Sequence, residues 1–264
     1  MMVRALRSLQ LRALDAADRL SGRADPLVPP RRLQFVGDSD FRATGDEFLR
    51  LFIDLAGLEP GERVLDVGCG IGRMARPLAG YLRPPGAYEG FDIVPEGIAW
   101  CRGRYARSYP HFSFHLAEVT NGLYRPEGGV PAREYTFPHP DDSFDFAFAT
   151  SVFTHLMPEE TERYLAEMAR VTRPGGRLLT TFFVLDAQRP AGGVGPGSSF
   201  TFAHDQGHYA TDSVDVPEAA VAYKEPWLRE RLSAHGLTLV EPLHRGTWSG
   251  GHGVSFQDIL LTRV

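Results

Sequence analysis

A short apolar segment that runs into three closely spaced glycines constrains the fold of this chain more than any other feature. Val64, Leu65 and Val67 suit a parallel strand that is covered on both faces. The glycines at positions 68, 70 and 72 allow a sharp turn and let a ligand approach the backbone without meeting a Cβ atom. This succession predicts a ligand site at the end of a buried strand in an α/β fold.

Two residues beside these glycines narrow the kind of ligand. Arg73 stands where a dinucleotide-binding loop has its third glycine, which argues against a nucleotide-dependent oxidoreductase. Asp66 precedes the first glycine by two residues, where a carboxylate would repel a pyrophosphate but suits a cation such as the amino group of an amino acid. The predicted ligand is therefore nucleoside-like at one end and amino-acid-like at the other.

A second strand, over residues 88–94, contains an acid about 20 residues past the glycine loop. Asp92 at the end of such a strand can accept hydrogen bonds from both hydroxyls of a ribose, and Ile93 would then lie against an adenine. The alternative for Asp92 is an N-cap of the helix predicted from Pro95. A third strand, over 112–118, ends in Glu118, which is either an adenine contact or an acid in a solvated loop.

Four segments resemble, in order and in spacing, the motifs of the class I S-adenosylmethionine-dependent methyltransferases: VLDVGCGIGRMARPLA, GFDIVPEGI, SFDFAFATSVFTHL and EMARVTRPGGRLLTTFF. The resemblance covers residues 45–185 and implies S-adenosylmethionine as the cofactor, with S-adenosylhomocysteine as its product. It also implies a cofactor site that includes Asp66, Gly68, Cys69, Gly70, Gly72, Arg73, Asp92, Ile93, Thr150 and Ser151. The family often has an Asp where this chain has Glu118.

Alternating strand and helix patterns predict a doubly wound, Rossmann-like α/β sheet. Seven strands are expected, the later ones over 144–150, 177–185, 237–243 and 254–262, and the resemblance implies that the last is antiparallel. We expect residues 1–60 to form a helical extension and cap, and residues 61–264 to form the methyltransferase domain. Residues 187–224 begin with a loose run rich in glycine and proline, so we predict a lid or acceptor-binding insertion there. The helix predicted over 3–20 is either an accessory helix or a basic helix at a lipid surface.

Composition excludes several classes of protein. A net charge of −5 and a pI near 6.0 argue against a general nucleic-acid binder, and the single lysine, Lys224, excludes mechanisms that need two active-site lysines. Cys69 and Cys101 suggest neither a disulfide framework nor a metal pair. With no apolar run of 18 residues and no signal-peptide pattern, we expect no transmembrane segment and a cytoplasmic location. The sequence leaves homo-oligomer formation open.

His155 is the candidate catalytic residue, because it closely follows the fourth predicted strand and titrates near neutral pH. It is either a general base for a hydroxyl proton or a histidine that only bonds its own loop or touches the cofactor. Asp186, at the end of the fifth strand, is either a site acid or a turn residue. Five residues of the insertion and the last turn are candidate substrate contacts: His204, His208, Tyr223, Trp248 and His252. Gly207 makes a helix between the two insertion histidines unfavourable, so no metal site is expected.

The residues after the fourth and fifth strands also bear on the acceptor. The segment Ala149–Phe153 lacks the Pro-Pro-aromatic run of enzymes that methylate nucleobase or glutamine nitrogen, and the acids of magnesium-dependent catechol enzymes are missing. We therefore predict O-methylation of a small hydroxylated acceptor. Polar residues of the insertion suggest a sugar, a glycosylated metabolite or a glycolipid. The alternatives are N- or C-methylation of a small metabolite and a non-catalytic S-adenosylmethionine-binding protein.

Overall fold

The computed structural model describes residues 25–34, 40–122, 125–193, 195 and 197–264, together with Leu11, Leu14, Asp15, Ala17 and Leu20. Most of the helix predicted over residues 3–20 lies outside the described residues. Its role, and the boundary proposed at residue 60, therefore stay predictions.

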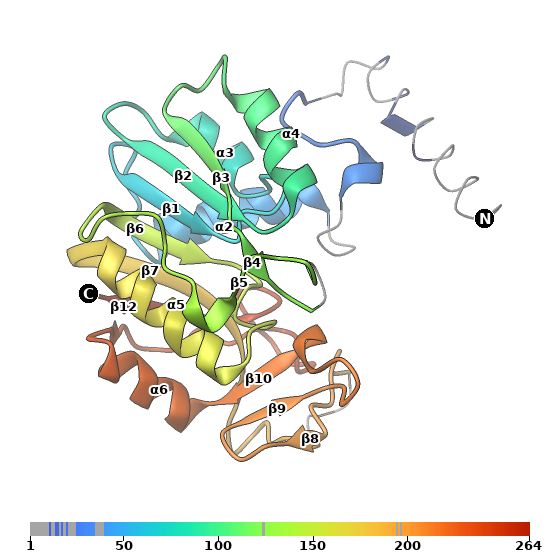
Figure 1. The fold of residues 1–264 in the computed structure, drawn as a ribbon. Coiled ribbons are helices and arrows are strands. Elements are labelled where there is room, and N and C mark those ends of the chain that lie inside the picture. Colours follow the sequence, from blue (N-terminus) through green and yellow to red (C-terminus); the bar gives the residue numbers. More distant parts are fainter. Residues whose placement is uncertain are drawn as a thin grey trace.

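Seven strands form the sheet that the alternating pattern predicts, in the order β3-β2-β1-β6-β7-β12-β11 (Figure 1). They are β1 (Arg63–Val67), β2 (Ala87–Asp92), β3 (Phe112–Leu116), β6 (Phe144–Ala149), β7 (Thr172–Leu185), β11 (Thr238–Leu239) and β12 (Asp258–Arg263). The first five are mutually parallel, and β12 runs antiparallel to β7. The doubly wound topology and the antiparallel last strand are confirmed.

The insertion after β7 adds three strands that the sequence did not predict, so the sheet has ten strands in the described chain rather than seven. β7 runs past the end of β6, and beyond Ala149 its backbone edge needs a new partner. β10 (Val221–Lys224) supplies it, in parallel register with Ala222 opposite Phe183. β9 (Tyr209–Thr211) and β8 (His204–Asp205) then extend the sheet in antiparallel fashion. Much of the predicted lid is therefore part of the sheet.

Helices cover both faces of the sheet. The elements α2 (Phe41–Asp54), α3 (Ala75–Tyr81) and α4 (Pro95–Tyr105) contribute to one apolar core, with Phe52 and Leu78 fully buried. The elements α5 (Pro158–Val171) and α6 (Glu225–Ala234) contribute to the core on the opposite face, with Leu165 fully buried. The remaining short elements are η1 (Arg31–Leu33), β4 (Val119–Thr120), β5 (Val130–Pro131), η2 (Ala132–Glu134) and η3 (Pro217–Ala219).

Candidate active site

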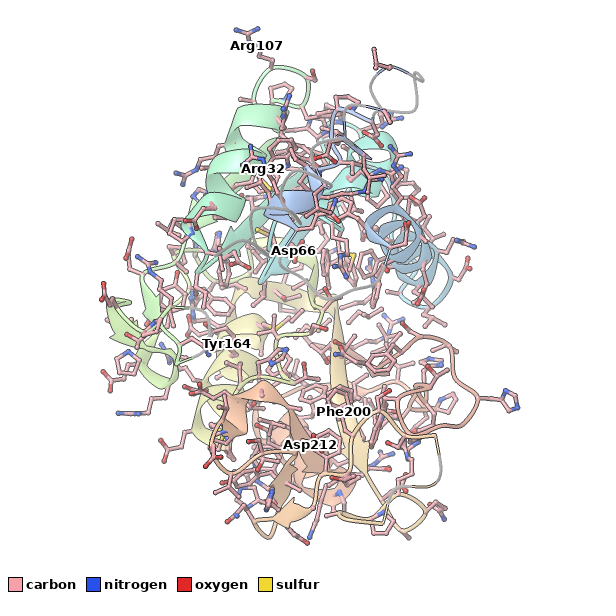
Figure 2. The ribbon with its side chains drawn as sticks, turned by 90° about the vertical axis from the view of Figure 1, so that its right-hand side faces the viewer. Arg32, Asp66, Arg107, Tyr164, Phe200 and Asp212 are labelled. Atoms are coloured by element: carbon pink, nitrogen blue, oxygen red, sulfur yellow. The ribbon has the colours of Figure 1, made fainter. Side chains whose placement is uncertain are left out.

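A cavity of about 730 Å³ lies at the carboxyl ends of the parallel strands, the edge at which open α/β sheets bind ligands. Its walls come from the loop after β1, the end of β2, the loop after β6, one side of α2, the end of β7 and the loop before β12. In Figure 2, Asp66 and Tyr164 of this wall lie within the body of the molecule, and Phe200 lies below them in the insertion. The cavity therefore joins segments from nearly the whole length of the described chain.

The glycine loop has the geometry that its sequence predicts. Gly68, Gly70 and Gly72 have φ values of 79°, 56° and 82°, in the left-handed region that glycine adopts without strain. The N–H groups of Gly68 and Cys69 both donate to the carbonyl of Phe91, at 2.9 and 3.0 Å, which fastens the loop to β2. A Cβ atom at position 68 would lie 2.4 Å from Cγ2 of Val152, so the turn admits only glycine there.

Asp92 lines the cavity at the end of β2 and also supports the glycine loop. Its Oδ2 accepts a hydrogen bond from the N–H of Gly70 at 2.7 Å, and its Oδ1 accepts one from the N–H of Val94 at 2.8 Å. The N-cap of α4 is Val94, with no side-chain cap, so Asp92 does not have the alternative role of helix cap. Because a carboxylate oxygen can accept more than one hydrogen bond, both oxygens of Asp92 can also accept from the two hydroxyls of a ribose. Burial raises the pKa of Asp92.

Asp66 is a buried carboxyl group that also lines the cavity, with 1% of its surface exposed. Its Oδ2 accepts a hydrogen bond from the hydroxyl of Tyr88 at 2.6 Å, whereas its Oδ1 is buried without a hydrogen-bond partner. Burial raises the pKa of Asp66 to about 8. An unsatisfied buried oxygen of this kind needs a donor or a cation from a ligand. The site therefore fits the amino group at the methionine end of S-adenosylmethionine.

The other predicted cofactor residues divide into those that line the cavity and two that do not, Gly72 and Glu118. Cavity-lining residues include Cys69, Arg73, Ile93, Thr150 and Ser151. Glu118 does not line the cavity, and the expected adenine contact is corrected: its side chain is exposed and pairs with Arg125. The cause is the alternation of side chains along an extended chain, which buries Val119 of β4 and turns its neighbour outward. Val119 and Asn121 line the cavity instead.

His155 lies in the cavity wall, in the loop between β6 and α5. Its Nδ1 is 2.9 Å from the carbonyl oxygen of Glu218 in η3. Because a carbonyl only accepts, Nδ1 carries the proton and Nε2 is the basic nitrogen of the neutral ring. Burial lowers the pKa of His155, which favours this neutral form at pH 7.

Two predicted substrate contacts are part of the core instead. Tyr223, on β10, is fully buried, donates its hydroxyl to the carbonyl of Leu156 at 2.7 Å and also bonds the hydroxyl of Thr161 at 2.9 Å. Trp248 is fully buried and its Nε1 donates to Asp258 at 2.8 Å. Neither lines the cavity: Tyr223 on the added strand β10 packs into the core, and Trp248, between β11 and β12, packs against Phe183 and Phe202.

The three histidines named as substrate contacts do not line the cavity either. His204 lies on β8 at the far edge of the sheet, His208 stacks on Trp227 with ring centroids 5.1 Å apart, and His252 is exposed. Within the described ranges, no group of three His, Cys, Asp or Glu residues is arranged to hold a metal ion. No helix among the described residues has the length and apolar character to cross a bilayer.

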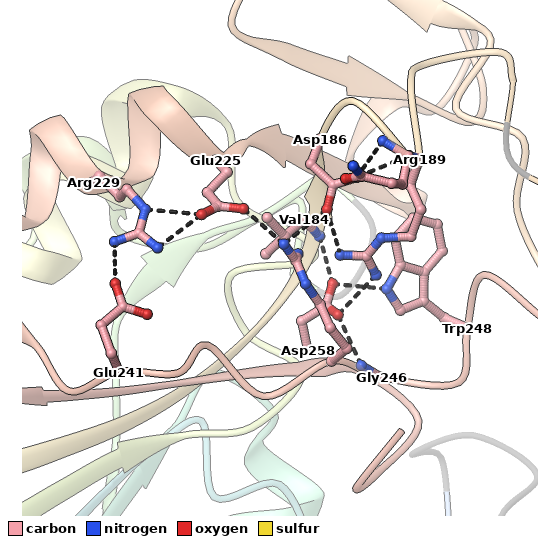
Figure 3. Close-up of polar contacts among 11 residues, drawn as sticks. Val184, Asp186, Arg189, Glu225, Arg229, Glu241, Gly246, Trp248 and Asp258 are labelled. Atoms are coloured by element: carbon pink, nitrogen blue, oxygen red, sulfur yellow. Dashed lines mark hydrogen bonds and ion pairs between the residues drawn. The ribbon is translucent and has the colours of Figure 1, made fainter. Parts of the chain in front are cut away.

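Asp186 is a turn residue rather than a site acid. Its Oδ1 accepts hydrogen bonds from the N–H groups of Gln188 and Arg189, and its Oδ2 pairs with the guanidinium groups of Arg189 and Arg245 (Figure 3). These contacts belong to a polar network around the buried Asp258 at the start of β12. The network fastens the first part of the insertion to the C-terminal strand.

The structure also adds three site residues that sequence reasoning missed: Glu47, Ser255 and Gln257. The predicted residue Ser151 has a φ of 57°, rare for a residue other than glycine. Its N–H donates to Oγ1 of Thr181, and its Oγ accepts from the side-chain amide of Gln257, both at 2.8 Å. From α2, Glu47 accepts a hydrogen bond from the hydroxyl of Ser255 at 2.6 Å, and both line the cavity. No local pattern marks these residues, because each acts through a partner far away in the sequence.

Comparison with known proteins agrees with this geometry. A family model described as a methyltransferase domain matches residues 65–180. The O-methyltransferase cnsE of Penicillium expansum is 32% identical over 130 residues, which are 49% of this chain and 41% of cnsE. The fatty-acid O-methyltransferase of Mycolicibacterium smegmatis is 38% identical over 121 residues, which are 46% of this chain and 37% of that enzyme. The chain thus spans less than half the length of these relatives.

Solved structures share the fold at low sequence identity. The 1,6-didemethyltoxoflavin-N1-methyltransferase of Burkholderia thailandensis has a TM-score of 0.54 and 17% identity, over 98% of this chain and 89% of that one. The [4+2]-cyclase SpnF has a TM-score of 0.55 and 19% identity, over 86% and 85% of the two chains. Residues 65–180 thus match a methyltransferase domain, and the sheet built on them has the fold of the class I S-adenosylmethionine-dependent methyltransferases.

Proposed function

We propose that the protein transfers the methyl group of S-adenosylmethionine to an oxygen atom of a small hydroxylated acceptor, with His155 as the general base. The observation that carries the proposal is the hydrogen bond from Nδ1 of His155 to the carbonyl of Glu218, in the wall of the cavity. It holds the ring in the tautomer whose Nε2 is basic. The lowered pKa keeps that nitrogen unprotonated at neutral pH.

Bound S-adenosylmethionine supplies a methyl group that is already activated by its sulfonium. Asp92 would hold the ribose hydroxyls and Asp66 the amino group, so the methyl group is oriented before the acceptor arrives. Nε2 of His155 then takes the hydroxyl proton as the acceptor oxygen bonds to the methyl carbon. The electrons of the broken carbon–sulfur bond stay on sulfur, and the proton gained by Nε2 of His155 is the one covalent change in the chain.

The acceptor class predicted from sequence was a sugar, a glycosylated metabolite or a glycolipid, on the basis of polar residues in the insertion. His204 and His208 do not line the cavity, and Asp212 bonds the backbone of Thr201 and Phe202. The proposal therefore keeps the hydroxylated acceptor and drops the preference for a sugar.

Isothermal titration with S-adenosylmethionine, S-adenosylhomocysteine and NAD tests the cofactor. Transfer of a tritiated methyl group to phenol, aniline, methyl α-glucoside and 1-decanol tests the reaction, with products identified by mass spectrometry. We expect binding of the first two ligands but not of NAD, and methyl ethers rather than N-methyl products. Cofactor binding without product from any probe would instead favour a protein that binds the cofactor without transferring its methyl group.

The substitution His155→Gln tests the base. It should leave the affinity for S-adenosylhomocysteine unchanged and lower turnover by about 10²- to 10⁴-fold, the usual contribution of a general base. His252→Gln, at an exposed histidine away from the cavity, is the matched control and should leave turnover unchanged. Equal turnover in His155→Gln and the wild-type protein would remove His155 as the base.

A further inference from the structure

We infer that the acceptor is a neutral, hydroxylated aromatic ring, held against a wall of three phenylalanines, Phe183, Phe200 and Phe256. This inference rests on the proposed function, since it concerns the acceptor end of the same cavity. All three residues line the cavity. Phe183 lies on β7, whereas Asp92 ends β2, and three strand spacings in the order β2-β1-β6-β7 separate the two strands by about 14 Å. The wall is thus at the opposite end of the cavity from the ribose site.

The three rings form one continuous apolar surface although they come from three parts of the chain. Phe183 comes from β7, Phe200 from the insertion and Phe256 from the loop before β12. Their ring centroids are 4.8 Å apart for Phe183 and Phe200, 6.2 Å for Phe183 and Phe256, and 6.5 Å for Phe200 and Phe256. These distances are those of rings in contact, so the rings make a wall rather than a slot between two parallel faces.

The wall is held in place from behind by two fully buried aromatic residues. Phe202 and Trp248 each contact Phe183, with ring centroids 5.3 Å apart, and they contact one another at 5.4 Å. Phe256, in contrast, is 46% exposed, and Phe200 is half-buried. An apolar surface that is supported behind and open toward a cavity gains free energy when an apolar ligand covers it.

The chemistry of the wall selects among acceptors. The phenyl rings offer no hydrogen-bond donor or acceptor, so a sugar placed there would lose its hydrogen bonds to water without replacement. The rings meet at angles of 51°, 90° and 56° and so present both faces and edges, the arrangement in which another aromatic ring packs best.

The charge beside the wall disfavours anionic acceptors. Glu47, Asp66, Asp92 and Arg73 line the cavity. Glu47 lies beside the wall, because it accepts a hydrogen bond from Ser255, the residue before Phe256, whereas Arg73 belongs to the glycine loop after β1. A carboxylate or phosphate on the acceptor would meet this acid in a partly desolvated space, which is unfavourable. A neutral aromatic acceptor has its hydroxyl as its one polar group. The polar residues that line the cavity after β6 are Thr150, Ser151, Thr154 and His155.

The test is isothermal titration of four probes in the presence of saturating S-adenosylhomocysteine: 2-naphthol, 1-decanol, methyl α-glucoside and 2-naphthoic acid. We expect 2-naphthol to bind at least tenfold more tightly than any other probe. Phe200→Ala and Phe256→Ala should each weaken its binding by at least tenfold. Val214→Ala, at an insertion residue that is 68% exposed and not part of the cavity wall, is the control and should change nothing.

The outcomes separate this inference from the proposed function. Equal or tighter binding of the alcohol, the glucoside or the acid would overturn it, and so would unchanged 2-naphthol affinity in both phenylalanine variants. Thermal unfolding and S-adenosylhomocysteine affinity, measured on every variant, should match the wild type and show that the fold and the cofactor site are intact. If S-adenosylhomocysteine itself fails to bind the wild-type protein, the proposed function fails. A normal cofactor titration without preference for 2-naphthol removes only the aromatic acceptor.

Discussion

The side-chain amide of Gln257 donates a 2.8 Å hydrogen bond to the hydroxyl of Ser151, across 106 residues of sequence. Oε1 of Gln257 accepts the hydroxyl proton of Thr181 at 2.7 Å, and Oγ1 of Thr181 accepts the N–H of Ser151 at 2.8 Å. The three residues thus close a ring of hydrogen bonds that joins the loop after β6, strand β7 and the residue before β12. This ring holds Ser151 in its left-handed conformation, with its hydroxyl proton left to donate to a ligand.

Replacing Gln257 with alanine should therefore weaken cofactor binding. The change leaves two hydroxyl groups without their partner, and at about 1 kcal/mol for each lost hydrogen bond we expect a loss of about tenfold or more in affinity. Titration with S-adenosylhomocysteine measures it. Gln206→Ala, at an exposed glutamine of the insertion, should bind like the wild type. Unchanged affinity in Gln257→Ala would mean that the ring does not support the cofactor site.

Replacing Asp92 with alanine should cost more, because this carboxylate both supports Gly70 and would accept hydrogen bonds from the ribose. A charge-assisted hydrogen bond contributes about 1.5 to 3 kcal/mol, so the Kd for S-adenosylhomocysteine should rise by about 10- to 150-fold. Asp92→Asn retains an oxygen acceptor and should lose less. Calorimetry that finds wild-type affinity in Asp92→Ala would refute the ribose assignment.

Cofactor binding should also depend on pH through Asp66. With a pKa raised to about 8, Asp66 is mostly protonated at pH 6 to 7. Because the positively charged amino group of the ligand favours the ionised carboxylate, Asp66 must lose its proton when the ligand binds. The association constant for S-adenosylhomocysteine should therefore rise by about tenfold per pH unit below pH 8 and level off above it. Asp66→Asn, titrated in parallel, should lack this rise. The same slope in both proteins would assign it to the ligand.

The same substitution should stabilise the unliganded protein. Between the ordinary pKa of 3.8 and the raised value of about 8, the folded state binds more protons at Asp66 than the unfolded state does. The contribution of Asp66 to the free energy of unfolding of the wild-type protein therefore falls as the pH rises from about 4 to about 8. Thermal unfolding of Asp66→Asn should match the wild type near pH 4 and exceed it increasingly toward pH 8. A constant difference at all pH values would contradict this expectation.

Asp258 should dominate the stability of the C-terminal strand. It accepts hydrogen bonds from the N–H groups of Val184 and Gly246, from Nε1 of Trp248 and from Arg189, at 2.8 to 3.0 Å (Figure 3). Asp258→Ala leaves these buried donors and an arginine charge without their acceptor, so the free energy of unfolding should fall by about 3 to 5 kcal/mol.

An exposed acid provides the comparison for this change. Asp141 pairs with Arg170 at 2.7 Å near the surface, where an ion pair contributes about 0 to 1 kcal/mol. Denaturant unfolding of Asp141→Ala should therefore lie within that range of the wild type. Similar losses in the two variants would mean that burial does not set the contribution of Asp258.

Much of the cofactor end of the site could be predicted from the sequence. The glycine loop, the acid in β1 and the acid that ends β2 follow from the steric and hydrogen-bonding needs of a short continuous segment. At Gly68, for example, the turn requires a φ of 79°, which glycine adopts without strain. The alternation of apolar strands and helices likewise predicted the doubly wound sheet, whereas its antiparallel last strand was implied by the family resemblance.

Only the tertiary structure decided the acceptor end. Because β7 extends beyond β6, the insertion pairs with its free edge and becomes part of the sheet. This pairing buries Tyr223, which the sequence predicted to be a substrate contact. The ring through Ser151 and Gln257 and the wall formed by Phe183, Phe200 and Phe256 join segments whose distance apart is set by strand length and register. Contacts of that kind depend on how the whole chain packs, so no local pattern of residues encodes them.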